Sequence, residues 1–170
     1  VAAILAPSFP AEFTEFSPGM LAGMLRKLGF KWVNEVAFGA DLVADRYRKL
    51  IDDSGKPYIA TTCPAVVAYV EKYFPSLIKN LAPIASPMIA TARVLKKLHG
   101  KNIHVVFIGP CVAKKSESMD VKLNREIDAV LTFAELREMF NESKIRLEDA
   151  ESSDFDPPYG NTGMLFPIPG

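Results

Sequence analysis

The sequence has 170 residues, with 20 Lys and Arg against 20 Asp and Glu, so its formal net charge is zero. A neutral chain lacks the excess of positive charge that drives nonspecific nucleic-acid binding, and we expect no nucleic-acid partner. Hydrophobic residues make up 49% and charged residues 24%, which is typical of a packed domain and excludes a disordered chain. The length suits one globular domain.

No apolar run approaches the length needed to cross a bilayer, and the opening VAAILAP is too short for a signal peptide and has no basic flank. We therefore expect a cytoplasmic protein without membrane insertion. Two cysteines are too few for a disulfide framework in a domain of this size. They are either reduced structural thiols or parts of a site.

The first half of the chain predicts a buried strand at 1–6, a helix at 18–28, a strand at 31–38, a helix at 42–51 and a strand at 58–61. Ser17-Pro18 provides an N-cap followed by proline at the first helical position, and Gly29 ends that helix.

The second half predicts helices at 66–73 and 87–99, strands at 103–108 and 127–131, and a helix at 133–140. Ser86-Pro87 repeats the cap and proline signature, and Thr132 with Glu135 forms a capping box. From Glu148 onward no periodic element is visible, so we expect a largely irregular tail from about 148.

Strands that alternate with helices at this spacing predict an α/β fold, with a parallel sheet and helices on its faces. Ligands collect at the carboxyl ends of the strands in such sheets. The loop at 6–9 and the turns at Cys63 and Cys111 are expected to emerge there, because each follows a predicted strand. These three loops predict a site at one edge of the sheet.

The residues alone leave the role of the cysteines open. Buried free cysteines are common, so Cys63 and Cys111 are either packed thiols or ligands. Lys114 and Lys115 near Cys111 favour a site, because they would neutralise an anionic cluster. Closed zinc and iron–sulfur sites need about four ligands, and beyond the two cysteines only His99 and His104 remain, both of which we interpret as structural.

Several motifs, in this order, resemble the carboxyl-terminal, cluster-bearing domain of the iron-only hydrogenase large subunit. The resemblance covers nearly the whole chain and is carried by Thr61-Thr62-Cys63-Pro64, Val70-Glu71-Lys72-Tyr73-Phe74-Pro75, Ser86-Pro87-Met88, the run from Gly109-Pro110-Cys111 to Glu117, and Ile127-Asp128-Ala129-Val130-Leu131-Thr132. It implies the parallel-sheet fold of that family.

The resemblance also implies a site. In that family a [4Fe-4S] cluster bound by four cysteines shares one thiolate with a diiron subcluster that carries carbon monoxide and cyanide. Cys63 and Cys111 match the first two ligands of the [4Fe-4S] cluster. Lys114 and Ser8 match residues that contact the iron-bound cyanides, and Glu117 matches a structural glutamate. Ser86 and Gly109 complete the set of expected cofactor-binding residues. The implied electron partner is a ferredoxin-like protein.

Some positions depart from the family pattern. Thr62 stands where the family has a proton-relay cysteine, and a hydroxyl relays protons less readily than a thiol. Gly109 stands in place of a methionine, Met88 in place of a glutamine, and Arg46 and Tyr47 in place of paired glutamates. These departures resemble the divergent branches of the family, which are sensory or do not turn hydrogen over.

The third and fourth cluster cysteines of the family lie in a glycine-rich motif after a stretch like 154–156 and 160–163. This sequence stops at Gly170 without that motif. We therefore expect residues 1–170 to be a single fragment of the cluster domain, inactive and without a firmly bound cluster by itself, while the full-length protein binds [4Fe-4S]. The alternative is an interaction or regulatory module with a degenerate cluster site.

Overall fold

The computed structural model describes residues 1–123 and 126–163, and a parallel four-stranded sheet forms its centre. The strand order is β2-β1-β3-β4, with β1 at Ala2–Leu5, β2 at Trp32–Glu35, β3 at Val105–Ile108 and β4 at Ala129–Leu131. Every residue of β1 is buried, as expected for a central strand covered on both faces. The α/β fold predicted from the sequence is confirmed.

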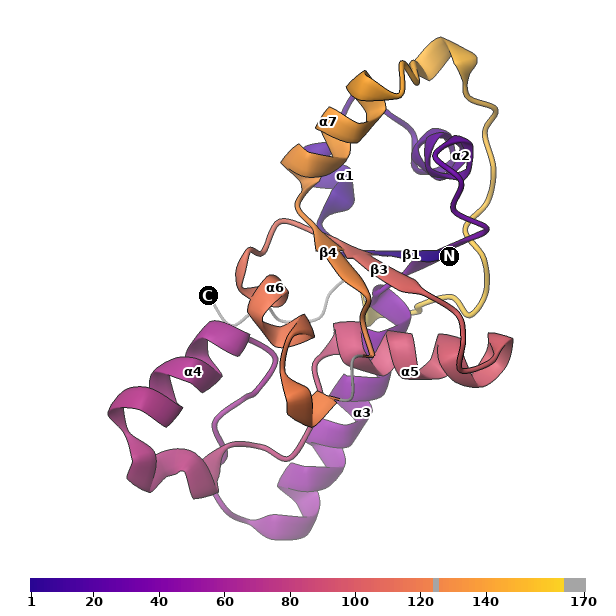
Figure 1. Ribbon diagram of the computed structural model, residues 1–170. Coiled ribbons are helices and arrows are strands. Elements are labelled where there is room, and N and C mark those ends of the chain that lie inside the picture. The colour runs from indigo at the N-terminus through magenta and orange to yellow at the C-terminus, as the bar shows by residue number, and fades with distance from the viewer. Residues whose placement is uncertain (124–125, 164–170) are drawn as a thin grey trace.

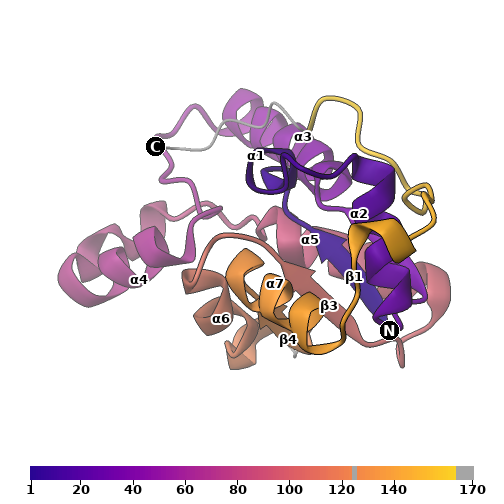
Figure 2. The same ribbon diagram turned by 90° about the horizontal axis from the view of Figure 1, so that it is seen from above.

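Helices cover both faces of this sheet (Figures 1 and 2). One face carries α1 (Phe9–Glu12), α2 (Pro18–Lys27) and α7 (Phe133–Glu142), and the other carries α3 (Ala37–Ser54) and α5 (Pro87–His99). A smaller lobe beside the sheet contains α4 (Pro64–Tyr73), the 3₁₀ helix η1 (Pro75–Asn80) and α6 (Ala113–Ser118). Two short 3₁₀ helices complete the set, η2 (Val121–Leu123) and η3 (Leu147–Asp149).

The predicted helix caps are present. The Ser17 hydroxyl accepts the Met20 N–H at 3.2 Å, and the buried Ser86 hydroxyl accepts the N–H of Ile89. Thr132 and Glu135 form the complete capping box at the start of α7. Each such cap contributes about 1 kcal/mol to helix stability, so these starts are fixed locally by sequence.

The strand predicted at 58–61 is wrong. This segment makes one isolated parallel bridge, from Ile59 to Leu81, and belongs to the smaller lobe. The helix α3 has 18 residues and carries the chain about 27 Å away from the sheet before the segment begins. β3 occupies the place beside β1. Cys63 therefore precedes a helix but does not follow a strand of the sheet.

The largest differences from the predicted element boundaries are at β2 and α3. The predicted strand at 31–38 is shortened to β2, because α3 begins at Ala37 rather than at 42. The short helices α1, η1 and α6 have no counterpart among the predicted elements, because they are too brief to show apolar periodicity.

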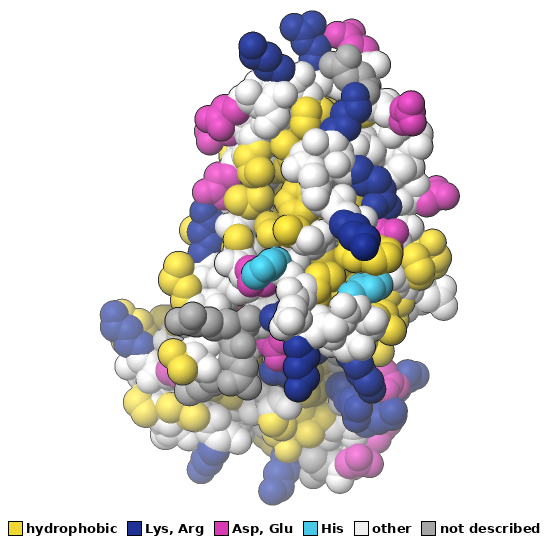
Figure 3. Space-filling model, turned by 45° about the vertical axis from the view of Figure 1, so that its right-hand side comes forward, with side chains coloured by type: hydrophobic (Ala, Val, Ile, Leu, Met, Phe, Trp, Pro, Cys, Tyr) yellow, Lys and Arg dark blue, Asp and Glu magenta, His cyan; other side chains and the backbone are white. Residues whose placement is uncertain are grey.

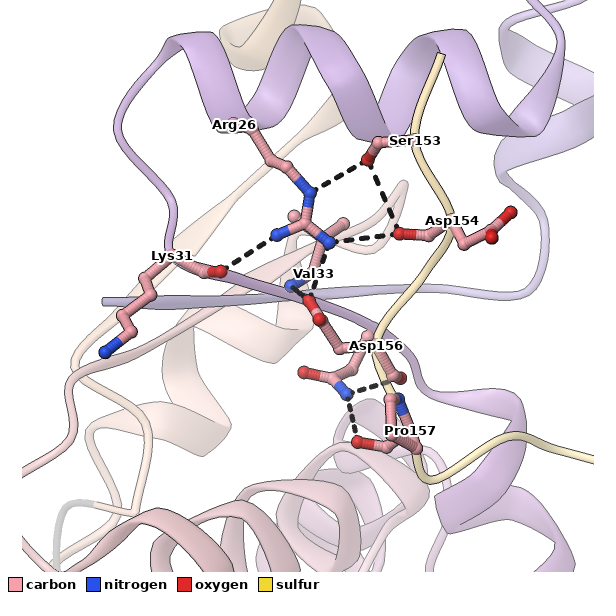
Figure 4. Close-up of polar contacts among 8 residues, drawn as sticks. Arg26, Lys31, Val33, Ser153, Asp154, Asp156 and Pro157 are labelled. Carbon is pink, nitrogen blue, oxygen red and sulfur yellow. Dashed lines mark hydrogen bonds and ion pairs between the residues drawn. The ribbon is translucent and has the colours of Figure 1, made fainter.

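Residues 150–162 form no helix or strand, yet many contacts fix them across the molecule (Figure 4). Arg26 donates to the Ser153 hydroxyl at 2.8 Å and to the Asp156 carboxylate at 2.9 Å. Asp156 also pairs with the edge strand β2, since its N–H donates to the Val33 carbonyl and its carboxylate accepts the Val33 N–H, both at 2.7 Å. This tail therefore covers the exposed edge of the sheet.

The tail then runs to the start of α3. The carboxylate of Asp41 accepts the backbone N–H groups of Asn161 and Thr162 at 2.6 and 3.1 Å. Gly163 lies so close to Ala37 that an added Cβ would be 1.8 Å from the carbonyl oxygen of that residue. Within residues 1–123 and 126–163, no helix has the length and apolar character that a membrane crossing requires.

Candidate functional site

The carboxyl edge of the sheet brings the loops after β1 and β3 together. Leu5 and Ile108 are register partners in these adjacent strands, and the N–H of Ala6 donates to the Ile108 carbonyl at 2.8 Å. Ser8 follows the first strand, and Cys111 follows the second. Strand pairing therefore places these two loops at the same edge of the sheet, as the alternation of strands and helices predicted.

Gly109 permits this close approach. Its N–H donates to the carbonyl of Leu131 at 3.0 Å, which joins the loop to β4. A Cβ at this position would lie 2.8 Å from the Cβ of Ala6 and 2.7 Å from the Phe107 ring. A larger side chain would therefore push the Ser8 and Cys111 loops apart.

Cys63 lies at the N-cap position of α4, and its carbonyl accepts the N–H of Val67 at 3.2 Å. Cys111 begins the turn into α6 in the same manner, because its carbonyl accepts the Lys114 N–H at 3.1 Å. Both thiols are half-buried and free of disulfide bonds. Each cysteine thus stands on a turn whose backbone is held by the helix that follows.

Lys114 joins these two cysteine-bearing turns. Its Nζ donates to the carbonyl of Thr62 at 3.2 Å and to the carboxylate of Glu117 at 2.5 Å. The side chains of Lys114 and Glu117 are only 12% and 10% exposed, so their ion pair is weakly screened by water. The residue before Cys63 is therefore bound to the residue three positions after Cys111.

The next residue, Lys115, connects α6 to the start of α7. Its Nζ contacts the Glu135 carboxylate in a short ion pair, and Glu135 also accepts the N–H and hydroxyl of Thr132. These contacts, led by the Lys115 hydrogen bond, lower the pKa of Glu135 to about 2. The capping box is visible in the sequence, but the ion pair with Lys115 is not, because the two charges are 20 residues apart.

The turn before Cys63 is also anchored to α3. The Tyr47 hydroxyl accepts the N–H of Thr61 at 2.8 Å, and the Thr61 hydroxyl lies 2.7 Å from the carbonyl of Ile84. Ser86, the cap of α5, follows Ile84 by two residues, so the Thr61 hydroxyl links the segment before α5 to the cysteine turn. No sequence signal pointed to the pairing of Tyr47 with Thr61.

Thr62 contributes a buried hydroxyl that has no hydrogen-bond partner within the described residues. A buried polar atom without a partner costs about 1 to 3 kcal/mol, so such atoms commonly mark an absent ligand or water. This hydroxyl belongs to the residue that precedes Cys63 and whose carbonyl binds Lys114.

The two histidines are exposed on one face of the molecule and do not join the cysteines (Figure 3). The ring of His99 stacks on Trp32 with centroids 4.2 Å apart. His104 bonds the carboxylate of Asp128 at 2.8 Å, just before β3. His99 therefore lies at the amino end of β2, through its contact with Trp32, and His104 lies at the amino end of β3. These positions agree with the structural role predicted for them.

These residues fit part of an iron–sulfur cluster. Two half-buried free thiols, an ammonium group that binds the carbonyl of the residue before one of them, and a buried hydroxyl without a partner are a suitable donor set for an anionic cluster. Within the described part of the chain, no group of three or more His, Cys, Asp or Glu side chains could hold a metal ion. The described residues therefore contain two cysteine thiols, fewer than the four ligands that such a cluster requires.

Comparison with known proteins agrees with this geometry. The whole chain, residues 1–170, matches the family model described as iron only hydrogenase large subunit, C-terminal domain. Iron hydrogenase 1 of Clostridium pasteurianum is 33% identical over 171 residues, which cover 89% of this chain and 30% of that protein. The cytosolic Fe-S cluster assembly factor NAR1 of Kluyveromyces lactis is 29% identical over 126 residues, which cover 72% of this chain and 27% of that protein.

The fold comparison gives the same result. A solved structure of the [FeFe]-hydrogenase HydA1 of Chlamydomonas reinhardtii matches with a TM-score of 0.74 and 29% sequence identity, covering 94% of this chain and 46% of that one. This chain spans less than half the length of each of these three relatives. By its sequence and its fold, the chain belongs to the family of the iron-only hydrogenase large subunit, in its C-terminal domain.

Proposed function

We propose that this chain is part of an iron–sulfur protein and that Cys63 and Cys111 supply two thiolate ligands to a [4Fe-4S] cluster. The observation that carries the proposal is the hydrogen bond from Lys114 to the Thr62 carbonyl, since it ties the two cysteine-bearing turns together. Membership of the iron-only hydrogenase family supports the choice of an iron–sulfur cluster as the ligand of these thiolates. The remaining ligands of a four-cysteine cluster lie outside this sequence, which has two cysteines.

The residues around the thiols favour negative charge there. The ammonium of Lys114 is held in place by Glu117, and Cys63 stands at the N-terminus of α4, where the helix dipole favours negative charge. Ser8 lies at the same edge as Cys111, because their loops follow paired strands. A bound cluster would supply one-electron redox chemistry.

A diiron subcluster would need polar donors for its ligands. Lys114 and Ser8 are our candidates for that role, by the family resemblance, with Ser86 and Gly109 bordering the same region. The whole protein would then use the cluster either for hydrogen, proton and electron chemistry or for hydrogen sensing, with a ferredoxin-like electron partner. We expect the cytoplasm as its location, and no hydrogenase activity of the isolated chain.

The sensing role is favoured over rapid hydrogen turnover by one observation. Thr62 holds a hydroxyl where a relay thiol would be needed, and that hydroxyl has no partner among the described residues through which a proton would pass. Tyr47, another of the departures, accepts a hydrogen bond from the N–H of Thr61. The relatives also include a protein named as a cluster assembly factor, which makes a role without turnover a second candidate.

The test is anaerobic reconstitution with iron and sulfide, followed by counting of iron per chain. We expect loose or no iron binding by residues 1–170 and four irons in the longest natural polypeptide that contains them. Cys63→Ser and Cys111→Ser should each reduce iron in the longer protein, whereas Ser76→Ala, on the exposed surface of η1, should not. Equal iron in the cysteine variants would refute the ligand assignment and leave the interaction-module alternative.

Hydrogen uptake by the longer protein, loaded with its diiron cofactor, separates the two uses of the cluster. Slow or undetectable uptake would support sensing. Turnover comparable to that of other family members would refute it, while Thr62→Cys should raise turnover if the relay position limits the rate.

A further inference from the structure

Thr61 and Thr62 are adjacent in the chain, but their hydroxyls are bonded differently. The Thr61 hydroxyl lies 3.0 Å from the carbonyl oxygen of Ala82 and 2.7 Å from that of Ile84. The buried Thr62 hydroxyl has no hydrogen-bond partner within the described residues, the neighbouring Cys63 thiol included. Hydrogen bonds to the chain therefore explain the first hydroxyl, whereas none in the described part explains the second.

The backbone on both sides of the Thr62 hydroxyl is fixed. The N–H of Thr61 donates to the Tyr47 hydroxyl at 2.8 Å, and the carbonyl of Thr62 itself accepts from the Nζ of Lys114 at 3.2 Å. The carbonyl of Cys63 accepts a backbone N–H from the first turn of α4. Threonine is β-branched and has few χ1 rotamers, so its hydroxyl cannot turn freely toward a new partner.

The ammonium of Lys114 has a donor to spare near this hydroxyl. An ammonium group has three N–H donors, and within the described part of the chain it contacts two acceptors, the Thr62 carbonyl and the Glu117 carboxylate. The side chain of Lys114 is only 12% exposed, so water has little access to the third donor. Because the carbonyl and the hydroxyl belong to one residue, covalent geometry keeps the ammonium within about 8 Å of the Thr62 hydroxyl.

Spare buried donors indicate a ligand that accepts hydrogen bonds. A buried hydroxyl without a partner costs free energy, and an unoccupied ligand position is one reason why native proteins retain such atoms. Thr62 directly precedes Cys63, which we propose as a cluster ligand. An iron–sulfur cofactor carries negative charge on its sulfur atoms and accepts hydrogen bonds from the surrounding protein. It is therefore a suitable acceptor for these donors.

We propose that the Thr62 hydroxyl, together with the third N–H of Lys114, donates a hydrogen bond to the iron–sulfur cofactor held by Cys63 and Cys111, and that it thereby raises the reduction potential of that cofactor. This inference rests on the proposed function, because it requires the cofactor. Reduction adds a negative charge, so a hydrogen-bond donor stabilises the reduced form more than the oxidised form. The hydroxyl then sets the electron affinity of the cofactor.

The first measurement is urea denaturation of residues 1–170 without a cofactor. Thr62→Val replaces the hydroxyl by a methyl group of similar size and should raise the urea midpoint, because a buried polar atom without a partner is removed. Thr61→Val makes the same change one residue earlier and should lower the midpoint, because that hydroxyl is bonded. A lower midpoint in Thr62→Val would overturn the proposal, since the hydroxyl would then have a partner before any cofactor binds.

The second measurement is a redox titration, followed by EPR spectroscopy, of the longer natural polypeptide reconstituted with iron and sulfide. Thr62→Val should lower the equilibrium constant for reduction about tenfold, which is roughly 59 mV for one electron. Thr62→Ser keeps the hydroxyl and should stay close to the wild-type potential. Thr14→Val, the same change as Thr62→Val at an exposed position, should leave the potential unchanged. Equal potentials in the two valine variants would overturn the proposal.

Electron–nuclear double resonance tests the contact itself. The reduced cofactor of the wild type should show coupled protons that disappear in D₂O, because hydroxyl and ammonium protons exchange with solvent. One of these protons should be missing in Thr62→Val and present in Thr62→Ser. If Thr62→Val retains all of them, the donor is another group and the proposal is overturned.

Iron content distinguishes the failure of this proposal from the failure of the proposed function. Thr62→Val should bind as much iron as the wild type, because its hydroxyl is not a ligand. If Cys63→Ser and Cys111→Ser retain their iron, the cluster assignment fails and this proposal fails with it. If iron binding depends on both cysteines but Thr62→Val keeps the wild-type potential, this proposal fails alone.

Discussion

The hydroxyl of Tyr47 on α3 accepts the backbone N–H of Thr61 at 2.8 Å and lies 3.1 Å from the hydroxyl of that same residue. Thr61 is two residues before Cys63, and its own hydroxyl reaches the carbonyls of Ala82 and Ile84. The long helix on one face of the sheet therefore fixes a turn in the smaller lobe. This contact replaces the strand pairing that fixes Cys111.

Removal of the Tyr47 hydroxyl should loosen the Cys63 turn. In Tyr47→Phe the Thr61 N–H loses its partner at a partly buried position, at a cost of about 1 to 3 kcal/mol. We expect Cys63 to react with iodoacetamide several times faster while Cys111 keeps its rate, as measured by peptide mass spectrometry. Tyr159→Phe, which removes a hydroxyl from a side chain that is 61% exposed, is the control. Equal acceleration at both cysteines would mean that Tyr47 supports the whole domain instead.

The sequence predicted those parts of the fold that depend on local signals. Ser17, Ser86 and Thr132 begin helices as expected, because a cap is formed by residues three positions apart. The prediction of a strand at 58–61 was wrong because this segment belongs to the smaller lobe. A short apolar run is compatible with several kinds of buried segment, so its pattern alone does not identify a strand of the sheet.

The candidate site was predicted less completely, for a related reason. Sequence order placed Ser8 and Cys111 at one edge, since parallel strands present their carboxyl ends together. The contact of Lys114 with Thr62 spans 52 residues, and that of Lys115 with Glu135 spans 20. Contacts at such separations depend on the packing of α6 between two elements, which no local pattern encodes.

The ion pair of Lys114 and Glu117 should have a large effect on stability. Both side chains are nearly buried, so either single variant, Lys114→Met or Glu117→Leu, leaves one charge without its partner. We expect each to lower the free energy of unfolding by about 3 to 5 kcal/mol, as measured by urea denaturation. The double variant should lose less than the two single losses together, because no unpaired charge remains.

The exposed pair of Arg48 and Asp45 provides the control for that experiment. Arg48 is 73% exposed, and Arg48→Met should change stability by less than about 1 kcal/mol. If Lys114→Met is equally mild, water reaches the pair and Lys114 does not hold the cysteine turns together. Strict additivity in the double variant would lead to the same conclusion.

Glu135 should make the stability of the domain sensitive to acid. Its pKa is held at about 2, against an ordinary value of 4.5, chiefly by the hydrogen bond from Lys115 and then by those from Thr132. Because the folded pKa is depressed, the stabilisation is fully present above pH 4.5 and is lost as the pH falls through about 2. The free-energy difference between the wild type and Glu135→Gln should therefore shrink across that range.

Urea denaturation at several pH values measures this difference. Glu138→Gln removes a carboxylate from an exposed position of the same helix and is the matched control. Identical pH profiles for the two variants would show that the contact with Lys115 does not determine the acid response. If Lys115→Met loses the same pH dependence of the free energy of unfolding as Glu135→Gln, the acid response is assigned to the ion pair of these two residues.

Arg26 should control whether the tail covers the edge of the sheet. Its guanidinium donates to Ser153, Asp154 and Asp156, and Asp156 in turn pairs with Val33 of β2 (Figure 4). Arg26→Met keeps the aliphatic stem but removes these donors, so the amides of the tail should exchange with solvent faster while those of β1 stay protected. Arg146→Met, at a side chain that is 75% exposed, controls for the loss of one arginine and should leave exchange unchanged. If the amides of β1 also exchange faster, the tail is required for the sheet to form. If exchange in the tail is unchanged, the pairing of Asp156 with β2 holds the tail without Arg26.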